Sequence, residues 1–191
     1  TALVAARATR PAVQRVDDRW YSLVQRTRTP SRWRLSHVLD RGFSTIPDWS
    51  ARVAVTAVLV RRRRWRALGG WVLTIVLGEV CIGPVKAAIG RFRPPDPLVR
   101  TSDTSYPSGH AIAAATTAPG MVLALVPPGR GRDVALSAAV AIAAATAVSR
   151  TDLNAHWLSD SVGGFSLGAG FALAVPAAVD ALSAHRAARR P

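Results

Sequence analysis

Five apolar stretches, separated by short polar connections, most constrain what this chain can fold into. The stretches cover residues 43–60, 67–90, 110–126, 134–148 and 157–182, and polar residues interrupt the first of them. A helix that crosses a bilayer needs about 20 mainly apolar residues. We therefore expect an all-α integral membrane helical bundle of about five to six helices. Gly164 and Gly168 have the small-xxx-small spacing that lets membrane helices approach closely.

The net charge of +14 agrees with a membrane bundle. Nearly half of the 191 residues are apolar. This combination is understandable if the apolar residues lie in lipid and the basic residues lie in the flanking connections. The arginines fall between the apolar stretches and form no continuous stripe, so nucleic-acid binding is not expected. Cys81 is the only cysteine, which excludes a disulfide framework or a cysteine-based metal site within one chain.

The basic connections predict how the bundle is oriented. Residues 61–66 read RRRRWR, and the connection 127–133 and the tail 184–191 also carry arginines. If each apolar stretch crosses once, these three segments share one face, which the positive-inside rule makes cytoplasmic. The use of Arg in place of Lys and the richness in Ala indicate a bacterial source. We expect a multi-pass protein of the bacterial cytoplasmic membrane, with the connections 91–109 and 149–156 facing outward.

The N-terminal segment, residues 1–42, differs from the rest in being polar and rich in arginine. Its apolar residues recur at helical spacing, which predicts an amphipathic helix on the membrane surface; a solvated helix packed on the domain fits the pattern as well. The expected organisation is this interfacial segment, a membrane-embedded domain over residues 43–183, and the basic tail 184–191. Five crossings of the membrane place residues 1–42 on the outer side, although the positive-inside rule favours the cytoplasmic side for a segment this basic. Either this segment lies at the outer interface, or residues 43–60 do not form a single crossing.

The two outward connections hold three polar clusters, KAAIGRFRPP, PSGH and SRTDLNAHWLSD. Lys86, Arg93 and Arg150 are cations at the ends of apolar helices, where an unpaired charge is costly. Nearby carboxylates are too few to neutralise them, and guanidinium groups bind phosphate oxygens in a bidentate way. Ser108 and the backbone around Gly109 lie at a predicted helix start, where free N–H groups bind anions. The clusters therefore predict a phosphate site.

Two histidines complete a candidate reaction centre. His156 and Asp160 are spaced i, i+4, which on a helix places the carboxylate beside the imidazole. A carboxylate on one ring nitrogen fixes the tautomer and leaves the other nitrogen free to attack. His110 is then the general acid for the leaving oxygen. The hypothesis is phosphoryl transfer through a phosphohistidine, with positive groups stabilising the equatorial oxygens.

These clusters resemble the signature of the type 2 phosphatidic acid phosphatase (PAP2) superfamily. That signature is Lys-(six residues)-Arg-Pro, Pro-Ser-Gly-His, and Ser-Arg-(five)-His-(three)-Asp, and residues 67–175 match all three parts. The resemblance implies a metal-independent phosphatase without a cofactor. It also implies roles that agree with the chemistry above: phosphate binding by Lys86, Arg93, Ser108, Gly109 and Arg150, proton donation by His110, and attack by His156 with Asp160 as its partner.

The membrane members of the family act on lipid phosphates and diphosphates, so the expected partners are a lipid phosphate substrate and the bilayer. A polyprenyl phosphate or diphosphate carrier lipid is one candidate substrate, and phosphatidic acid or phosphatidylglycerol phosphate is the alternative. Asp152 stands where relatives often carry an apolar or aromatic residue. It is either a headgroup contact or a solvated loop residue, and we favour the second interpretation.

Two other function classes are weighed against this interpretation. Vanadium-dependent haloperoxidases share the signature, but they are typically soluble and much longer. A non-catalytic membrane scaffold does not explain a complete set of motif residues. The sequence indicates neither the oligomeric state nor the lipid tail of the substrate.

Overall fold

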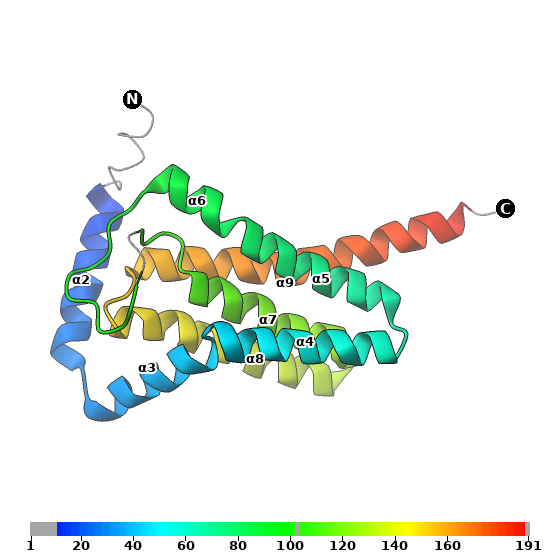
Figure 1. The fold of residues 1–191 in the computed structure, drawn as a ribbon, viewed down its shortest axis with the longest axis horizontal. Coiled ribbons are helices and arrows are strands. Elements are labelled where there is room, and N and C mark those ends of the chain that lie inside the picture. Colours follow the sequence, from blue (N-terminus) through cyan, green and yellow to red (C-terminus); the bar gives the residue numbers. More distant parts are fainter. Residues whose placement is uncertain (1–10, 102–103, 190–191) are drawn as a thin grey trace.

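The structure, a computed structural model, describes residues 11–101 and 104–189 (Figure 1). Within these ranges every regular element is a helix, which confirms the expected all-α fold. The elements are α2 (Pro11–Thr27), α3 (Pro30–Gly42), α4 (Thr45–Arg61), α5 (Trp65–Val80), α6 (Ile82–Ile89), α7 (Gly109–Leu125), α8 (Arg130–Asp152) and α9 (Leu158–Ala188).

Helix α7 lies at the centre of the bundle and packs against α4, α5, α8 and α9 (Figure 1). Most of its residues are small, and nearly all from Ala111 to Ala124 are buried. The predicted close approach of Gly164 and Gly168 is confirmed, because both face α7. A Cβ atom at Gly164 would lie 2.6 Å from the carbonyl oxygen of Ser108, and one at Gly168 would lie 2.7 Å from that of Ile112. Small residues thus let α7 and α9 touch through their backbones.

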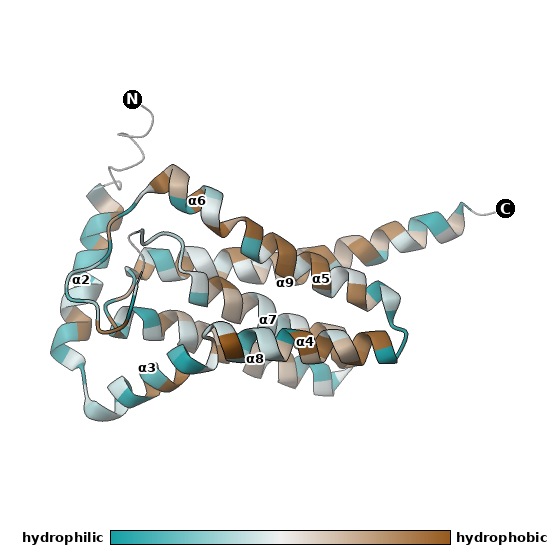
Figure 2. Cartoon of the chain, in the orientation of Figure 1, coloured by the Kyte–Doolittle hydropathy of each residue, from teal (hydrophilic) through white to brown (hydrophobic). Residues whose placement is uncertain are grey.

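Each of the five apolar stretches forms helix, and three segments are long and apolar enough to cross a membrane. These segments are Trp65–Ile89, Arg130–Asp152 and Leu158–Arg186, and α7 is apolar but shorter. The outer faces carry large exposed apolar side chains such as Val53, Val76 and Leu173. Figure 2 shows the contrast between the apolar bundle helices and the hydrophilic α2 and α3. The chain therefore has the surface of a membrane protein.

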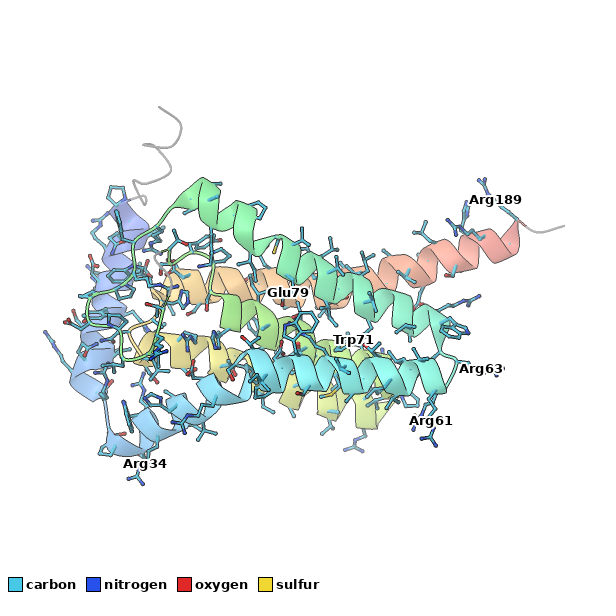
Figure 3. All side chains as sticks on the ribbon, in the orientation of Figure 1. Arg34, Arg61, Arg63, Trp71, Glu79 and Arg189 are labelled. Atoms are coloured by element: carbon cyan, nitrogen blue, oxygen red, sulfur yellow. The ribbon has the colours of Figure 1, made fainter. Side chains whose placement is uncertain are left out.

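The two kinds of connection separate to opposite ends of the bundle. The connections 90–108 and 153–157, which carry motif residues, lie together at one end, here called the site end (Figure 1). The α4–α5 connection, the α7–α8 connection and the last turns of α9 lie at the other end, here called the arginine end. Figure 3 shows Arg61, Arg63 and Arg189 there. The prediction that the basic connections share one face and the motif connections share the other is confirmed.

Helix α2 lies across the site end, and α3 packs against α8 (Figure 1). The indole nitrogen of Trp20 donates to Oγ1 of Thr151 at 2.9 Å, and the amide of Gln25 donates to Oδ1 of Asn154 at 2.7 Å. The described part of residues 1–42 is therefore two helices packed on the domain at the end where five crossings place it. Residues 1–10 lie outside the described residues.

Candidate active site

His156 lies in the short connection between α8 and α9, where the end of α8 fixes the backbone. The N–H groups of Ala155 and His156 both donate to the carbonyl oxygen of Arg150, at 3.0 and 3.2 Å. The imidazole is 4% exposed. Its Nδ1 lies 3.8 Å from Oδ2 of Asp160, and its Nε2 lies 3.2 Å from Nη1 of Arg93. One ring nitrogen therefore faces a carboxylate and the other faces a cation.

Asp160 is fully buried and hydrogen-bonded on both oxygens. Oδ1 accepts from Nη1 of Arg91 at 2.6 Å. Oδ2 accepts from the N–H of Trp157 at 2.9 Å and from the hydroxyl of Ser105. The carboxylate beside His156 is thus held in one orientation by groups from two other parts of the chain.

Arg91 extends this network to helix α2. Its Nη2 donates to Oδ2 of Asp17 at 2.6 Å, so the guanidinium bridges two buried carboxylates. Asp17 also accepts from the N–H of Ser159 at 2.9 Å and from its hydroxyl at 2.7 Å. The sequence analysis missed both Arg91 and Asp17. Arg91 was visible within the first polar cluster, whereas Asp17 is separated from its partners by 74 and 142 residues and has no local signal.

Lys86 and Arg93, both predicted to bind phosphate, converge on one backbone carbonyl. The ammonium of Lys86 donates to the oxygen of Thr104 at 2.7 Å, and Nη2 of Arg93 donates to the same oxygen at 2.8 Å. Arg93 also donates to the carbonyl oxygen of Ala155. The first predicted cluster is therefore beside His156, as the hypothesis of a common site requires.

Arg150 and His110 meet at a carboxylate that the sequence analysis missed. Oδ1 of Asp40, on α3, forms an ion pair with Nη1 of Arg150 and lies 3.4 Å from Nε2 of His110. Arg150 is buried, whereas His110 and Asp40 are partly exposed. Asp40 lies near the end of the polar helix α3, at no recognisable spacing from either partner, which explains why sequence reasoning overlooked it.

Helix α7 begins at Gly109, which confirms the predicted helix start. Ser108 is its N-cap, and the hydroxyl accepts from the N–H of Ala111 at 3.4 Å. The N–H of Ser108 donates to the carbonyl oxygen of Asp160 at 3.2 Å. The second cluster is therefore fixed directly to the helix that carries Asp160, and the start of α7 with its free N–H groups faces the site end.

The interpretation of Asp152 as a solvated loop residue is wrong. Asp152 is the last residue of α8, and its side chain is buried. Its carboxylate accepts from Nη2 of Arg32 at 2.5 Å and from the hydroxyl of Ser36 at 2.9 Å, which ties α3 to α8. Sequence reasoning failed here because the partners lie more than 110 residues away.

Burial lowers the pKa of His156 to about 4, because removal of water penalises the charged imidazolium; the nearby cations Arg93 and Arg150 act in the same direction, while Asp160 opposes them. The imidazole is therefore neutral at neutral pH, the form in which a ring nitrogen can attack phosphorus. Across the described ranges no group of three His, Cys, Asp or Glu side chains is arranged to hold a metal ion.

The fold and the site together define a helical bundle with the surface of a membrane protein and a centre at one end in which buried arginines, carboxylates and a histidine meet. The chain belongs to the PAP2 superfamily, whose family profile matches residues 67–183, more than half of the chain. It is 37% identical over 89 residues to phosphatidylglycerophosphatase B of Bacillus subtilis (strain 168), covering 44% of each protein. It is 33% identical over 128 residues to undecaprenyl-diphosphatase of Sulfolobus acidocaldarius, covering 61% of this chain and 57% of that protein. The chain thus spans about half the length of these relatives.

Two solved structures resemble the whole bundle. The transmembrane PAP2 type phosphatidylglycerolphosphate phosphatase from Bacillus subtilis has a TM-score of 0.80 and 26% identity, with 96% of this chain and 91% of that chain covered. LpxE of Aquifex aeolicus has a TM-score of 0.66 and 17% identity, with 81% and 91% covered, a likeness of fold alone. The expected membrane bundle of the PAP2 type is therefore confirmed over nearly the full chain.

Proposed function

We propose that this protein is a membrane lipid phosphatase that hydrolyses a lipid phosphate or diphosphate through a phosphohistidine. The observation that carries the proposal is the pair of contacts on His156, with Asp160 beside Nδ1 and Arg93 beside Nε2. The carboxylate orients the ring, and the guanidinium lies where a phosphate would be attacked. Membership of the PAP2 superfamily and the names of the two relatives support the same activity.

In the first step, Nε2 of neutral His156 attacks the phosphorus, and the bond from phosphorus to the leaving oxygen breaks. His110 donates its proton to that oxygen, so that an alcohol leaves from a phosphate monoester and a lipid monophosphate leaves from a diphosphate. Lys86, Arg93 and Arg150 stabilise the charge on the equatorial oxygens. The N–H groups at the start of α7, around Ser108 and Gly109, add hydrogen bonds to the same oxygens.

In the second step, water attacks the phosphohistidine. His110 accepts a proton from this water, the phosphorus–nitrogen bond breaks, and the electron pair returns to Nε2 of His156. Inorganic phosphate leaves, and both histidines regain their starting states. Asp160 acts as a positioning residue throughout, because Arg91, Ser105 and Trp157 hold both of its oxygens.

We place the enzyme in the bacterial cytoplasmic membrane with the site end on the extracytoplasmic side. Support comes from the arginine end, whose basic connections belong on the cytoplasmic side by the positive-inside rule. The substrate's apolar tail would lie in the bilayer beside the bundle. A polyprenyl carrier lipid and a phospholipid phosphate are both compatible with this placement.

The test is phosphate release by the purified full chain in detergent micelles. The panel contains undecaprenyl diphosphate, phosphatidic acid and phosphatidylglycerol phosphate, with and without a chelator. We expect release from at least one lipid, unchanged by the chelator, and a 32P-labelled, acid-labile protein adduct after rapid quenching. His156→Gln should remove both release and adduct. No release from any lipid, or an adduct that persists in His156→Gln, would contradict the proposal.

A further inference from the structure

A cavity of about 610 Å³ lies at the arginine end of the bundle. It is bordered by the start of α5, the end of α7, the α7–α8 connection and the part of α9 around Pro176. Its volume is within the range of about 300–1,000 Å³ that is typical of small-molecule sites. Helix α7 begins at the site end and finishes beside this cavity, and its 17 residues span about 25 Å at 1.5 Å per residue. The cavity is therefore separate from the candidate active site.

The outer part of the cavity is basic. The charged residues described as lining it are four arginines and one carboxylate, namely Arg63, Arg64, Arg66, Arg132 and Asp180. None of the ion pairs formed within the described ranges includes any of these four arginines. Arg64 donates from Nη1 to the carbonyl oxygen of Leu125 at 3.3 Å. These guanidinium groups are available to an anion, and they bind phosphate oxygens through paired hydrogen bonds.

The inner part of the cavity is apolar. Trp71, which is 2% exposed, lines it together with Leu123. The indole N–H of Trp71 already donates to Oγ1 of Thr56 at 3.0 Å. The hydroxyl of Thr74, on the same wall, donates to the carbonyl oxygen of Gly70 at 2.8 Å. Since the protein itself uses these donors, the inner wall presents hydrocarbon, which favours an acyl chain over a polar ligand.

Trp65 relates the two parts of the cavity to the membrane. It lines the cavity and is 61% exposed at the start of α5, which continues into the apolar segment Trp65–Ile89. Exposed Trp side chains of membrane proteins concentrate at the level of the lipid headgroups. Trp71 lies about 9 Å further along the helix at 1.5 Å per residue. The arginines beside Trp65 are therefore at headgroup level, and Trp71 is at the level of the acyl chains.

We propose that this cavity binds an anionic phospholipid of the leaflet at the arginine end, with its phosphate on the arginines and part of one acyl chain against Trp71. A phospholipid joins a negative phosphate to hydrocarbon in one molecule, which matches both parts of the cavity. A zwitterionic lipid would bring a second cation to the arginines, which is unfavourable. Basic pockets between membrane helices bind anionic headgroups in other proteins.

This second lipid site does not depend on the proposed function. The residues described as lining it include no histidine, so no group there could take a phosphoryl group as His156 is proposed to do. The bound lipid is a ligand and not a substrate.

The test measures lipid binding to the purified full chain by native mass spectrometry from detergent micelles. The probes are dioleoyl phosphatidylglycerol, which is anionic, and dioleoyl phosphatidylcholine, which has the same chains and no net charge. Both are phosphate diesters, so the proposed reaction does not consume them. We expect the anionic lipid to bind more tightly by about tenfold or more. Equal affinities would overturn the inference.

Arg66→Gln/Arg132→Gln removes two of the guanidinium groups that line the cavity. It should weaken the binding of phosphatidylglycerol by about tenfold and leave that of phosphatidylcholine unchanged. The matched control is Arg61→Gln/Arg62→Gln, which removes the same charge from exposed residues of the same end that do not line the cavity. This control should keep most of the affinity. Equal weakening in the two double variants would show a general effect of charge and contradict a defined site.

Two further measurements separate a lipid from free phosphate and this cavity from the candidate active site. Inorganic phosphate in large excess should not displace phosphatidylglycerol, because it has no chain for the apolar wall. Lys86→Gln, which alters the phosphate site proposed at the other end, should leave the affinity for phosphatidylglycerol unchanged. Displacement by inorganic phosphate would contradict the role of the apolar wall. Weaker binding in Lys86→Gln would place the lipid at the candidate active site, and either result would overturn the inference.

Discussion

The two ends of the bundle use arginine in opposite ways. At the site end, Arg91 and Arg150 are buried, and each is paired with carboxylates from distant parts of the chain. At the arginine end, Arg61 is exposed at the end of α4, and Arg63 is exposed on the connection that joins α4 to α5 (Figure 3). Buried cations need partners, whereas exposed ones act through their number and their side of the membrane.

This difference teaches that one residue type carries two separate functions in this chain. Substitution of one arginine at the arginine end should hardly change the stability of the folded protein. The neighbouring arginines still set the orientation of the protein in the membrane. Substitution at the site end should leave a buried carboxylate without its counter-charge. The predictions below test this contrast, beginning with the largest expected effect.

His156→Gln should lower kcat for lipid phosphate hydrolysis by about 10³-fold or more, since it removes the group proposed to attack phosphorus. His185→Gln, at the exposed end of α9, is the matched control and should leave kcat unchanged. Steady-state phosphate release measures both. Comparable losses in the two variants would break the contrast between the ends.

Arg91→Met should destabilise the protein by about 3–5 kcal/mol, because Asp17 and Asp160 would be left buried without their shared cation. Arg61→Met should have an effect close to zero. Denaturant unfolding in detergent micelles measures both. The double variant Asp17→Asn/Arg91→Met should lose less than the sum of the two single variants, and strict additivity would contradict a direct bridge.

Gly168→Ala should cost about 1–3 kcal/mol, because the new Cβ would lie 2.7 Å from the carbonyl oxygen of Ile112 and force α9 away from α7. At Gly131, near the start of α8, a new Cβ would meet no atom within 4 Å, so Gly131→Ala should not destabilise. Thermal unfolding of the two variants measures the difference. A Gly168→Ala protein as stable as the original would show that the helices can separate freely.

Acid pH should inhibit only near the lowered pKa of His156, about 4. Activity should therefore persist at pH 5, where a histidine with an ordinary pKa of about 6.5 would be mostly protonated.

The lowered pKa of His156 also makes the stability of the folded protein depend on pH. Between about pH 6.5 and 4 the unfolded chain binds the proton that the folded chain does not, so stability is fully present above this window and falls as the pH drops through it.

The measurements are a pH–rate profile and unfolding curves at several pH values. His156→Gln should remove its share of the change in stability across this window. An acid limb of kcat/KM near pH 6.5 would contradict a buried, neutral His156.

The bundle and the three polar clusters could be predicted because their signals are local. The length and composition of the apolar stretches predict helices, and the motif residues lie at fixed spacings within short segments. The ends of the bundle followed from the same reasoning, since alternate connections of a crossing chain must share a face. Ser108 as the residue before α7 was predictable for the same local reason.

The supporting carboxylates could not be predicted, because each depends on a contact between distant segments. In the sequence, Asp17, Asp40 and Asp152 all lie in polar segments, far from the residues that they contact in the fold. In the structure they hold Arg91, Arg150 and Arg32 respectively. Asp48 and Arg52 seemed only to weaken an apolar stretch, yet with Glu79 they form a charged cluster inside the bundle.

The bridge from Asp17 through Arg91 to Asp160 has a consequence for how the enzyme comes into being. A ribosome makes the first of these residues early and the last only after most of the chain has been inserted into the membrane. The orientation of His156 therefore cannot be fixed until α9 has folded back beside α2. Activity should appear as the final event of biogenesis, and a nascent chain should be inactive until α9 has packed against α2.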